Sequence, residues 1–136
     1  MPLPITAVGV ALFALAMVAL GIVVIRARRA GGTSLGVAQD EPLTRAVRAQ
    51  GNFFEYTVPA LALVALCEAG GASPYLTAPL LAAFVAARAA HVYALLVAEP
   101  RGGARRFSWR VRAMGMTFAC LILLVALLGL VALGVA

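Results

Sequence analysis

Long apolar runs with very few charges constrain this chain more than any other feature. The first run, from Ile5 to Ile25, contains no charged residue, and as an α-helix its 21 residues span ~31 Å, close to the thickness of the hydrocarbon core of a bilayer. The run is too long for a signal peptide, and no basic residue precedes it. The whole chain is 64% hydrophobic and 12% charged, far from the balance of a soluble domain. We therefore predict a helical integral membrane protein.

The breaks between the apolar runs predict an all-α fold, a membrane four-helix bundle. Gly31 and Gly32 follow the first run, and Pro42 suits the first turn of the second helix. A turn at 68–74 and a glycine- and arginine-rich loop at 99–106 separate the later runs. We expect helices at about residues 4–28, 43–69, 75–97 and 109–134, within one transmembrane domain that covers residues 1–136.

The arginines predict how this bundle lies in the membrane. The chain contains no lysine, and all of its arginines except Arg88 flank the first and third connections: Arg26, Arg28, Arg29, Arg45, Arg48, Arg101, Arg105, Arg106, Arg110 and Arg112. By the positive-inside rule these two connections face the cytoplasm, and both termini lie outside. Because the arginines adjoin apolar runs, topology explains them better than nucleic-acid binding does, and we expect no nucleic-acid partner.

The second helix carries its polar residues on one face. At ~100° per residue, Arg45, Arg48, Asn52 and Glu55 share an arc of about 80° with Pro59. In lipid, such a narrow polar stripe must turn toward other protein or toward a water-filled cavity. The remaining helices are therefore expected to supply what this stripe faces.

The third helix brings two further polar residues into the membrane, Arg88 and His91. Glu55 and Arg88 lie at similar depths, ~18 Å and ~14 Å from the cytoplasmic ends of their helices, and an unpaired charge at that depth is costly. We therefore predict an ion pair between them. Two interpretations remain open: the pair only fixes helix packing, or the polar residues line a cavity, rimmed by arginines, for a small anion.

Motifs of soluble catalytic sites are not found in the sequence. One histidine excludes a multi-histidine metal site within one chain, and no metal is expected. The two cysteines, Cys67 and Cys120, lie inside apolar runs and are interpreted as small packing residues.

Residues 48–56, with the sequence RAQGNFFEY, resemble the second helix of the MAPEG family, the membrane-associated proteins in eicosanoid and glutathione metabolism. That helix carries Arg-Ala-x-x-Asn-x-x-Glu with a proline soon after, as here at Pro59. Residues 88–91 are similar to the family's Arg-x-x-His in the third helix, and weaker matches lie at 26–29 and at 105–115. The resemblance covers almost the whole chain and is to a bacterial-type member.

The resemblance implies a homotrimer of four-helix subunits that binds glutathione between neighbouring subunits, near the cytoplasmic face. The residues that would contact glutathione or support its contacts are Arg26, Arg48, Asn52, Glu55, Arg88 and His91. An arginine of the third connection, Arg105 or Arg106, would stabilise the thiolate and act as the catalytic residue.

Two functions follow from this resemblance. The first is a glutathione-dependent membrane transferase or peroxidase that acts on lipophilic electrophiles arriving from the membrane lipid. The second is a non-catalytic membrane protein that binds lipid or partner proteins through the same fold. In either case the expected location is the inner membrane of a bacterium.

Overall fold

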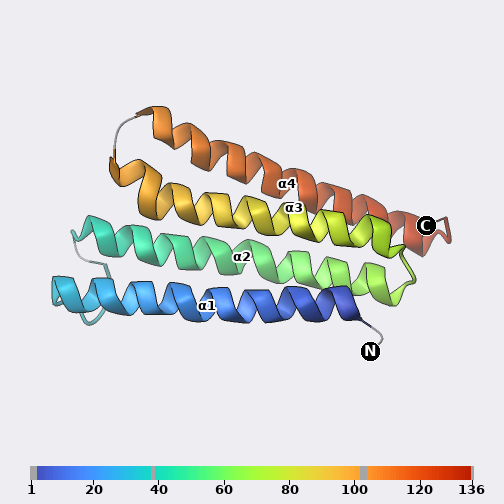
Figure 1. Ribbon diagram of the computed structural model, residues 1–136, viewed down its shortest axis with the longest axis horizontal. Helices are drawn as coiled ribbons and strands as arrows, with labels where there is room; N and C mark the ends of the chain where they lie inside the picture. The colour runs from blue at the N-terminus through green and yellow to red at the C-terminus, as the bar shows by residue number, and fades with distance from the viewer. Residues whose placement is uncertain (1–2, 38, 102–103, 136) are drawn as a thin grey trace.

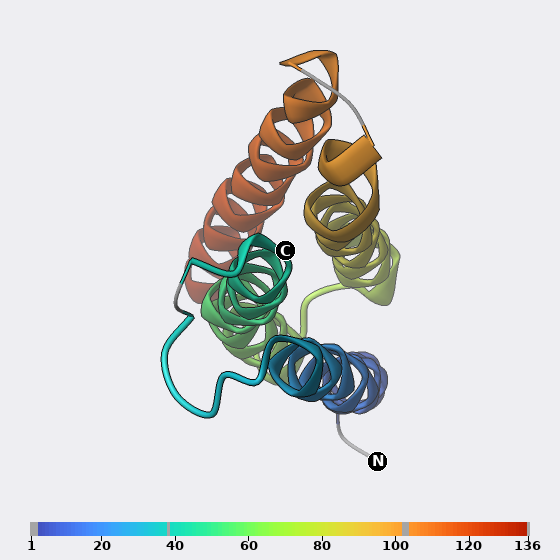
Figure 2. The ribbon, with the colours of Figure 1, turned by 90° about the vertical axis from the view of Figure 1, so that its left-hand side faces the viewer.

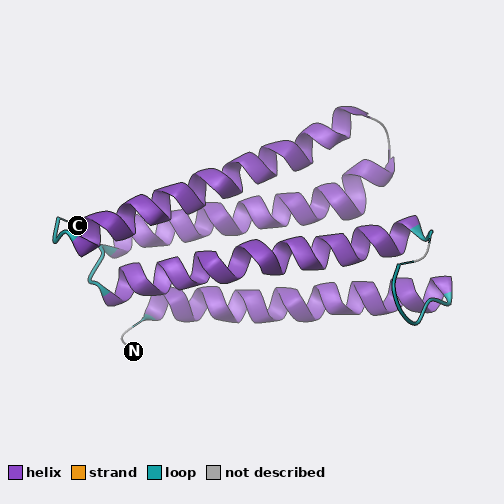
Figure 3. Ribbon diagram, turned by 180° about the vertical axis from the view of Figure 1, so that it is seen from behind, coloured by secondary structure: helices purple, strands orange, loops and turns teal. Residues whose placement is uncertain are grey.

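Four long helices account for most of the chain in a computed structural model (Figure 1). The structure describes residues 3–37, 39–101 and 104–135, with the backbone alone described for residues 104–106. The helices are α1 (Pro4–Gly31), α2 (Glu41–Ala69), α3 (Pro74–Tyr93) and α4 (Ala104–Ala132). A π-helical segment, η1 (Ala94–Ala98), and a 3-10 turn, η2 (Glu99–Arg101), continue α3. The described residues form helices and loops without any strand (Figure 3), so the predicted all-α four-helix bundle is confirmed.

Local sequence explains where the helices begin and end. Prolines stand in the first turns of α1, α2 and α3, where the missing N–H would have no helical partner. Asp40 caps α2 by accepting a hydrogen bond of 2.8 Å from the N–H of Leu43. Gly32 ends α1 with a φ of 63°, a conformation that glycine adopts without strain. At the third connection, where a loop was predicted up to residue 106, α4 already begins at Ala104.

The helices alternate in direction, so that the chain doubles back at each connection (Figure 1). Both arginine-rich connections lie at one end of the bundle, called here the basic end, and both termini lie at the other. Within the described residues, α1 packs mainly on α2 and does not contact α4. Seen from the basic end, α4 leans away from α2 (Figure 2), which opens the bundle there.

Three helical stretches are long and apolar enough to cross a membrane: Pro4–Gly31, Pro74–Arg101 and Phe107–Ala132. Large apolar side chains such as Leu15, Ile122 and Val125 are exposed on their outer faces, as suits contact with lipid. The chain is therefore an integral membrane protein. The fourth predicted span, α2, has 29 residues and runs beside the others (Figure 1), but it is not among these three apolar stretches. Its polar stripe accounts for this difference.

The largest hydrophobic cluster lies in the half of the bundle away from the basic end. It joins α2, α3 and α4 through Leu61, Val64, Phe84 and Leu124, among others. Apolar packing holds this half together, and the polar stripe of α2, from Arg45 to Glu55, lies nearer the basic end. The core therefore fixes three helices in this half, and the polar stripe of α2 lies beyond it.

Glu68, at the end of α2, caps the start of α1. Its carboxylate accepts hydrogen bonds from the backbone N–H of Ile5 and Thr6, both at 2.8 Å, and from the Thr6 hydroxyl at 2.7 Å. Leu3, at the N-cap position of α1, makes no side-chain cap of its own. Glu68 thus satisfies amides that the local sequence leaves free and ties α1 to α2.

Candidate functional site

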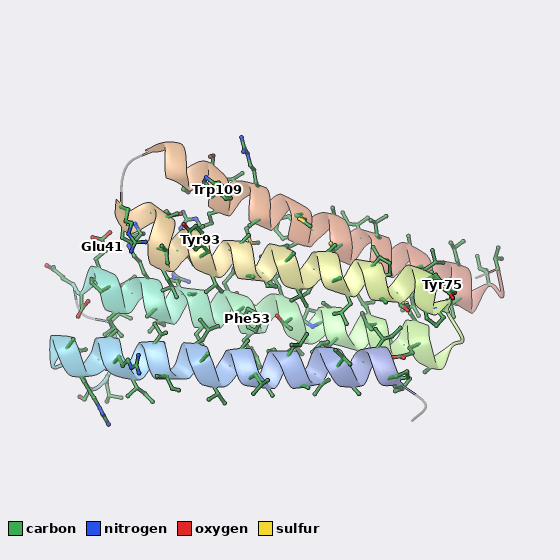
Figure 4. The ribbon with its side chains drawn as sticks, in the orientation of Figure 1. Glu41, Phe53, Tyr75, Tyr93 and Trp109 are labelled. Carbon is green, nitrogen blue, oxygen red and sulfur yellow. The ribbon has the colours of Figure 1, made fainter. Side chains whose placement is uncertain are left out.

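A groove of about 1180 Å³ opens at the basic end between α2 and α4, with α3 and η1 beneath it. Its α2 wall carries Glu41, Arg45, Arg48, Asn52 and Glu55; its α4 wall carries Phe107, Arg110, Val111, Met114 and Phe118; and its floor includes His91, Leu95 and Glu99. Glu41, labelled in Figure 4, marks the start of the α2 wall. The splay of α4 therefore opens a space in front of the polar stripe of α2.

The α2 wall presents two opposite charges with an amide between them. Arg48 and Glu55 are exposed and lie seven residues apart, about 10 Å along the helix axis. Where side chains are described, neither residue forms an ion pair or a hydrogen bond through its side chain. Both charges are therefore available to a ligand in the groove.

Arg88 is the most deeply buried charged residue of the described part, with 1% of its surface exposed. Its Nη1 donates to the Oδ1 of Asn52 at 2.7 Å, and its Nη2 donates to the hydroxyl of Thr117 at 2.5 Å. The guanidinium also lies 5.3 Å from the centre of the Tyr56 ring. These neutral groups compensate the buried charge in place of a carboxylate.

The predicted ion pair between Glu55 and Arg88 is therefore wrong. Arg88 turns inward, toward Asn52 on α2 and Thr117 on α4, whereas Glu55 is exposed on the wall of the groove. An exposed carboxylate keeps its solvation, so it has little need of a buried partner. Matched depth along two helix axes does not determine the side of the helix toward which each residue points.

The bond to Arg88 also fixes how Asn52 faces the groove. An asparagine amide has one oxygen that accepts and one NH2 that donates. Since the oxygen accepts from Arg88, the NH2 group is the part of the amide that remains to donate, and Asn52 lines the groove. Arg88 therefore lies beneath the site and orients a donor within it.

His91 lies on the floor of the groove and is 4% exposed. Its Nδ1 is buried without a hydrogen-bond partner among the described residues. A buried ring nitrogen without a hydrogen bond costs free energy of folding unless a ligand or a water molecule forms a hydrogen bond with it.

Four charged side chains form a chain of ion pairs across the mouth of the groove. Glu41 pairs with Arg45, whose Nη1 lies 3.1 Å from Oε2 of Glu99. The other oxygen of Glu99, Oε1, lies 3.3 Å from Nε of Arg110. Glu99 therefore joins the α2 wall to the α4 wall. Glu99 and Arg110 were not predicted as site residues, and Arg45 was predicted only as part of the polar stripe of α2.

The π-helical segment accounts for the position of Glu99. His91, Leu95 and Glu99 are spaced by four residues, and in a regular α-helix each step of four advances the face by ~40°. In residues 94–98 the hydrogen bonds reach five residues instead of four, which widens the turn. All three side chains therefore line one groove.

The structure brings together most, but not all, of the residues predicted for the site. Arg48, Asn52, Glu55 and His91 line one groove, and Arg88 lies beneath it. Arg26 is exposed on α1 and does not line this groove. Arg105 and Arg106 lie in the first turn of α4, but their side chains are outside the described part of the chain. The described residues include no group of three or more His, Cys, Asp or Glu that could hold a metal ion.

Comparison with known proteins agrees with this arrangement. No curated protein matches the chain. A sequence profile of the MAPEG family, in contrast, matches residues 6–130, which include all four helices almost completely and every residue of the groove. The chain therefore belongs to the MAPEG family.

Proposed function

We propose that the groove binds glutathione and that the protein is a membrane glutathione transferase or peroxidase acting on lipophilic electrophiles. The observation that carries this proposal is the pair of opposite charges on α2, Arg48 and Glu55, which have no partner among the described side chains, with the amide of Asn52 between them. Membership of a family that includes glutathione transferases supports the same assignment.

Glutathione is a complementary ligand for this wall because it carries carboxylates, an ammonium group and a thiol. Arg48 binds a carboxylate, since a guanidinium presents parallel N–H donors to it. Glu55 binds the ammonium group. Asn52 donates from its NH2 to a carbonyl or carboxylate oxygen. The buried Nδ1 of His91 forms a hydrogen bond with the peptide or with a bound water.

The reaction requires the thiolate, because the thiol itself is a weak nucleophile. A guanidinium beside the sulfur favours the thiolate and keeps its own proton. We assign this role to Arg105 or Arg106, in the first turn of α4, next to the groove. The apolar residues Val111, Met114 and Phe118 of the α4 wall provide a surface for a lipophilic electrophile.

Arg26 fits this proposal only in an assembly. It is exposed on α1, away from the groove of its own chain. In a homotrimer, the assembly that the family resemblance implies, Arg26 would contact glutathione bound in the groove of a neighbouring subunit. Cross-linking in detergent would test for three copies.

The decisive experiment measures glutathione binding and turnover by the purified protein in detergent. Titration calorimetry gives the affinity, ultraviolet absorbance reports the thiolate, and a chloronitrobenzene serves as the electrophile. We expect Arg48→Ala to weaken binding roughly tenfold or more, as the loss of a charged hydrogen bond implies. The control is Arg112→Ala, since Arg112 is exposed on α4 and does not line the groove.

If the wild-type protein binds no glutathione, the proposal is wrong. Binding with neither a thiolate signal nor turnover would favour the non-catalytic function instead.

We also propose that the basic end faces the cytoplasm. The arginines of both connections gather at this end, and both termini lie at the other (Figure 1), as the positive-inside rule requires of a protein with this orientation. A reporter that is active only in the cytoplasm should be inactive when fused after Ala136. Activity of that fusion would reverse the orientation.

A further inference from the structure

Arg110 differs from Arg45 and Arg48, which also line the groove, in the contacts that hold its side chain in place. Its Nε lies 3.3 Å from Oε1 of Glu99, and its guanidinium carbon lies 4.6 Å from the centre of the Phe107 ring. A carboxylate at one edge and an aromatic ring against one face fix the plane of a guanidinium. Arg110 is therefore positioned before any ligand arrives.

The contact through Nε leaves the terminal nitrogens of Arg110 free. The described side chains make no hydrogen bond to Nη1 or Nη2, and Arg110 lines the groove. A guanidinium has five N–H donors. The Nε of Arg110 forms an ion pair with Glu99 but not a hydrogen bond, since Oε1 of Glu99 accepts none among the described residues. The remaining donors include the parallel pair that binds a carboxylate.

The charges along the mouth of the groove are unequally compensated. Arg45 has two carboxylate partners, Glu41 and Glu99. Arg110 shares Glu99 with Arg45 and has no second carboxylate partner in the described part of the chain. Glu99 is itself sheltered, with a side chain that is 13% exposed. Arg110 is therefore the member of this chain of ion pairs that retains the most capacity for an added anion.

We infer that Arg110 is a second carboxylate-binding residue of the groove and that Glu99 is the residue that positions it. This inference rests on the proposed binding of glutathione and specifies which part of the peptide Arg110 recognises. In glutathione, the ammonium group and one carboxylate share a carbon atom, so Glu55 and Arg48 on α2 hold that end. The glycine carboxylate lies at the opposite end of the peptide and meets Arg110 on the α4 wall.

The inference predicts a selectivity for ligands with two separated carboxylates. Glutathione should bind more tightly than its ethyl ester at the glycine carboxylate, or than γ-glutamylcysteine, which lacks the glycine. Arg110→Ala should lower the affinity for glutathione roughly tenfold and leave the affinity for the ester unchanged, so that the ratio of the two affinities falls to about one. Arg112→Ala, on another face of the same helix, should keep the ratio.

The role of Glu99 is tested by the same ratio. Glu99→Gln should lower it because Arg110 loses the partner that orients it. Glu41→Gln should not, because the 73% exposed Glu41 forms its ion pair with Arg45 and none with Arg110 among the described residues. Arg110→Lys provides a second test, since it keeps the charge and loses the Nε contact. It should also lower the ratio, and it remains informative if Glu99→Gln does not fold.

The outcomes separate this inference from the proposed function. If wild-type protein binds no glutathione, both are wrong. If it binds glutathione and Arg110→Ala keeps the wild-type ratio, only the inference about Arg110 is wrong. A loss of turnover with an unchanged ratio would likewise overturn it, because Arg110 would then act on the sulfur.

Discussion

Arg88 donates to Asn52 at 2.7 Å and thereby couples a buried charge on α3 to the wall of the groove on α2. The same guanidinium reaches Thr117 on α4, so one side chain connects the three helices that form the groove. None of these partners is charged. The arrangement has a cost in stability, since burying a charge without a counter-ion is unfavourable, and a benefit for the site, since Asn52 is oriented.

Replacing Arg88 should therefore affect binding more than stability. In Arg88→Met the buried charge disappears, Thr117 keeps its hydrogen bond to the carbonyl of Ala113 at 2.8 Å, and half-buried Asn52 can turn to water. We expect the free energy of unfolding to stay equal or to rise by up to ~2 kcal/mol, as for other buried charges replaced by apolar groups. Glutathione affinity should fall roughly tenfold. Thermal unfolding and calorimetry measure the two effects, and a large fall in stability would contradict this account.

Glu55→Gln should leave stability unchanged, because Glu55 is exposed and forms no ion pair in the described part of the chain. The melting temperature in detergent should match that of the wild type. Glutathione affinity should fall roughly tenfold through the lost contact with the ammonium group. The affinity for N-acetylated glutathione, in which that charge is blocked, should be the same in both proteins. An equal loss for both ligands would mean that Glu55 does not bind the amine.

The arginines of the first turn of α4 are expected to act on turnover. Alanine at Arg105 or Arg106 should lower kcat much more than it weakens glutathione binding, whereas Arg48→Ala should chiefly raise the apparent KM. Rates with a chloronitrobenzene, together with the thiolate absorbance, provide the measurement. If both single variants and the double variant keep full turnover, the thiol is activated elsewhere or the protein is not a transferase.

Glu68 should make the stability of the bundle depend on pH. It lies outside the three apolar spans. Burial alone would raise the pKa of its carboxyl, but the hydrogen bonds from Ile5 and Thr6 outweigh burial and lower the pKa below its ordinary value of 4.5. A lowered pKa contributes stability that is fully present above the ordinary value and is lost as the pH falls through the folded-state value.

The melting temperature should therefore fall more steeply below pH ~4 in the wild type than in Glu68→Ala. At neutral pH the variant should be less stable by about 1 kcal/mol, the usual cost of a lost helix cap. Identical pH profiles for the two proteins would show that Glu68 does not hold α1.

Periodicity was sufficient to predict the α2 wall, because residues on one helix keep their relative directions whatever packs against them. Arg48, Asn52 and Glu55 accordingly line one groove. The partner of Arg88 could not be predicted in this way, because it depends on how α3 is rotated against α2. That rotation is set by packing in the core, where Phe84 and Leu81 are buried against α2 and α4.

Glu99 was missed for a different reason. Residues 94–98, with the sequence ALLVA, contain no glycine, proline or polar residue that would signal a departure from the α-helix. The wider turn is therefore a property of the tertiary structure. Without it, Glu99 counts as part of a connecting loop, and its contacts with Arg45 and Arg110 have no basis in the sequence.

The π-helical turn also affects how this chain is aligned with its relatives. A hydrogen bond that spans five residues adds a residue to the turn compared with an α-helix. A relative with a regular helix at this point would have one residue fewer between the counterpart of His91 and the start of its last helix. If the two chains were aligned by counting residues from the histidine, an arginine of the loop in one protein would be matched to the residue next to its true counterpart in the other. Functional residues beyond Ala98 are therefore compared reliably only by superposing α4.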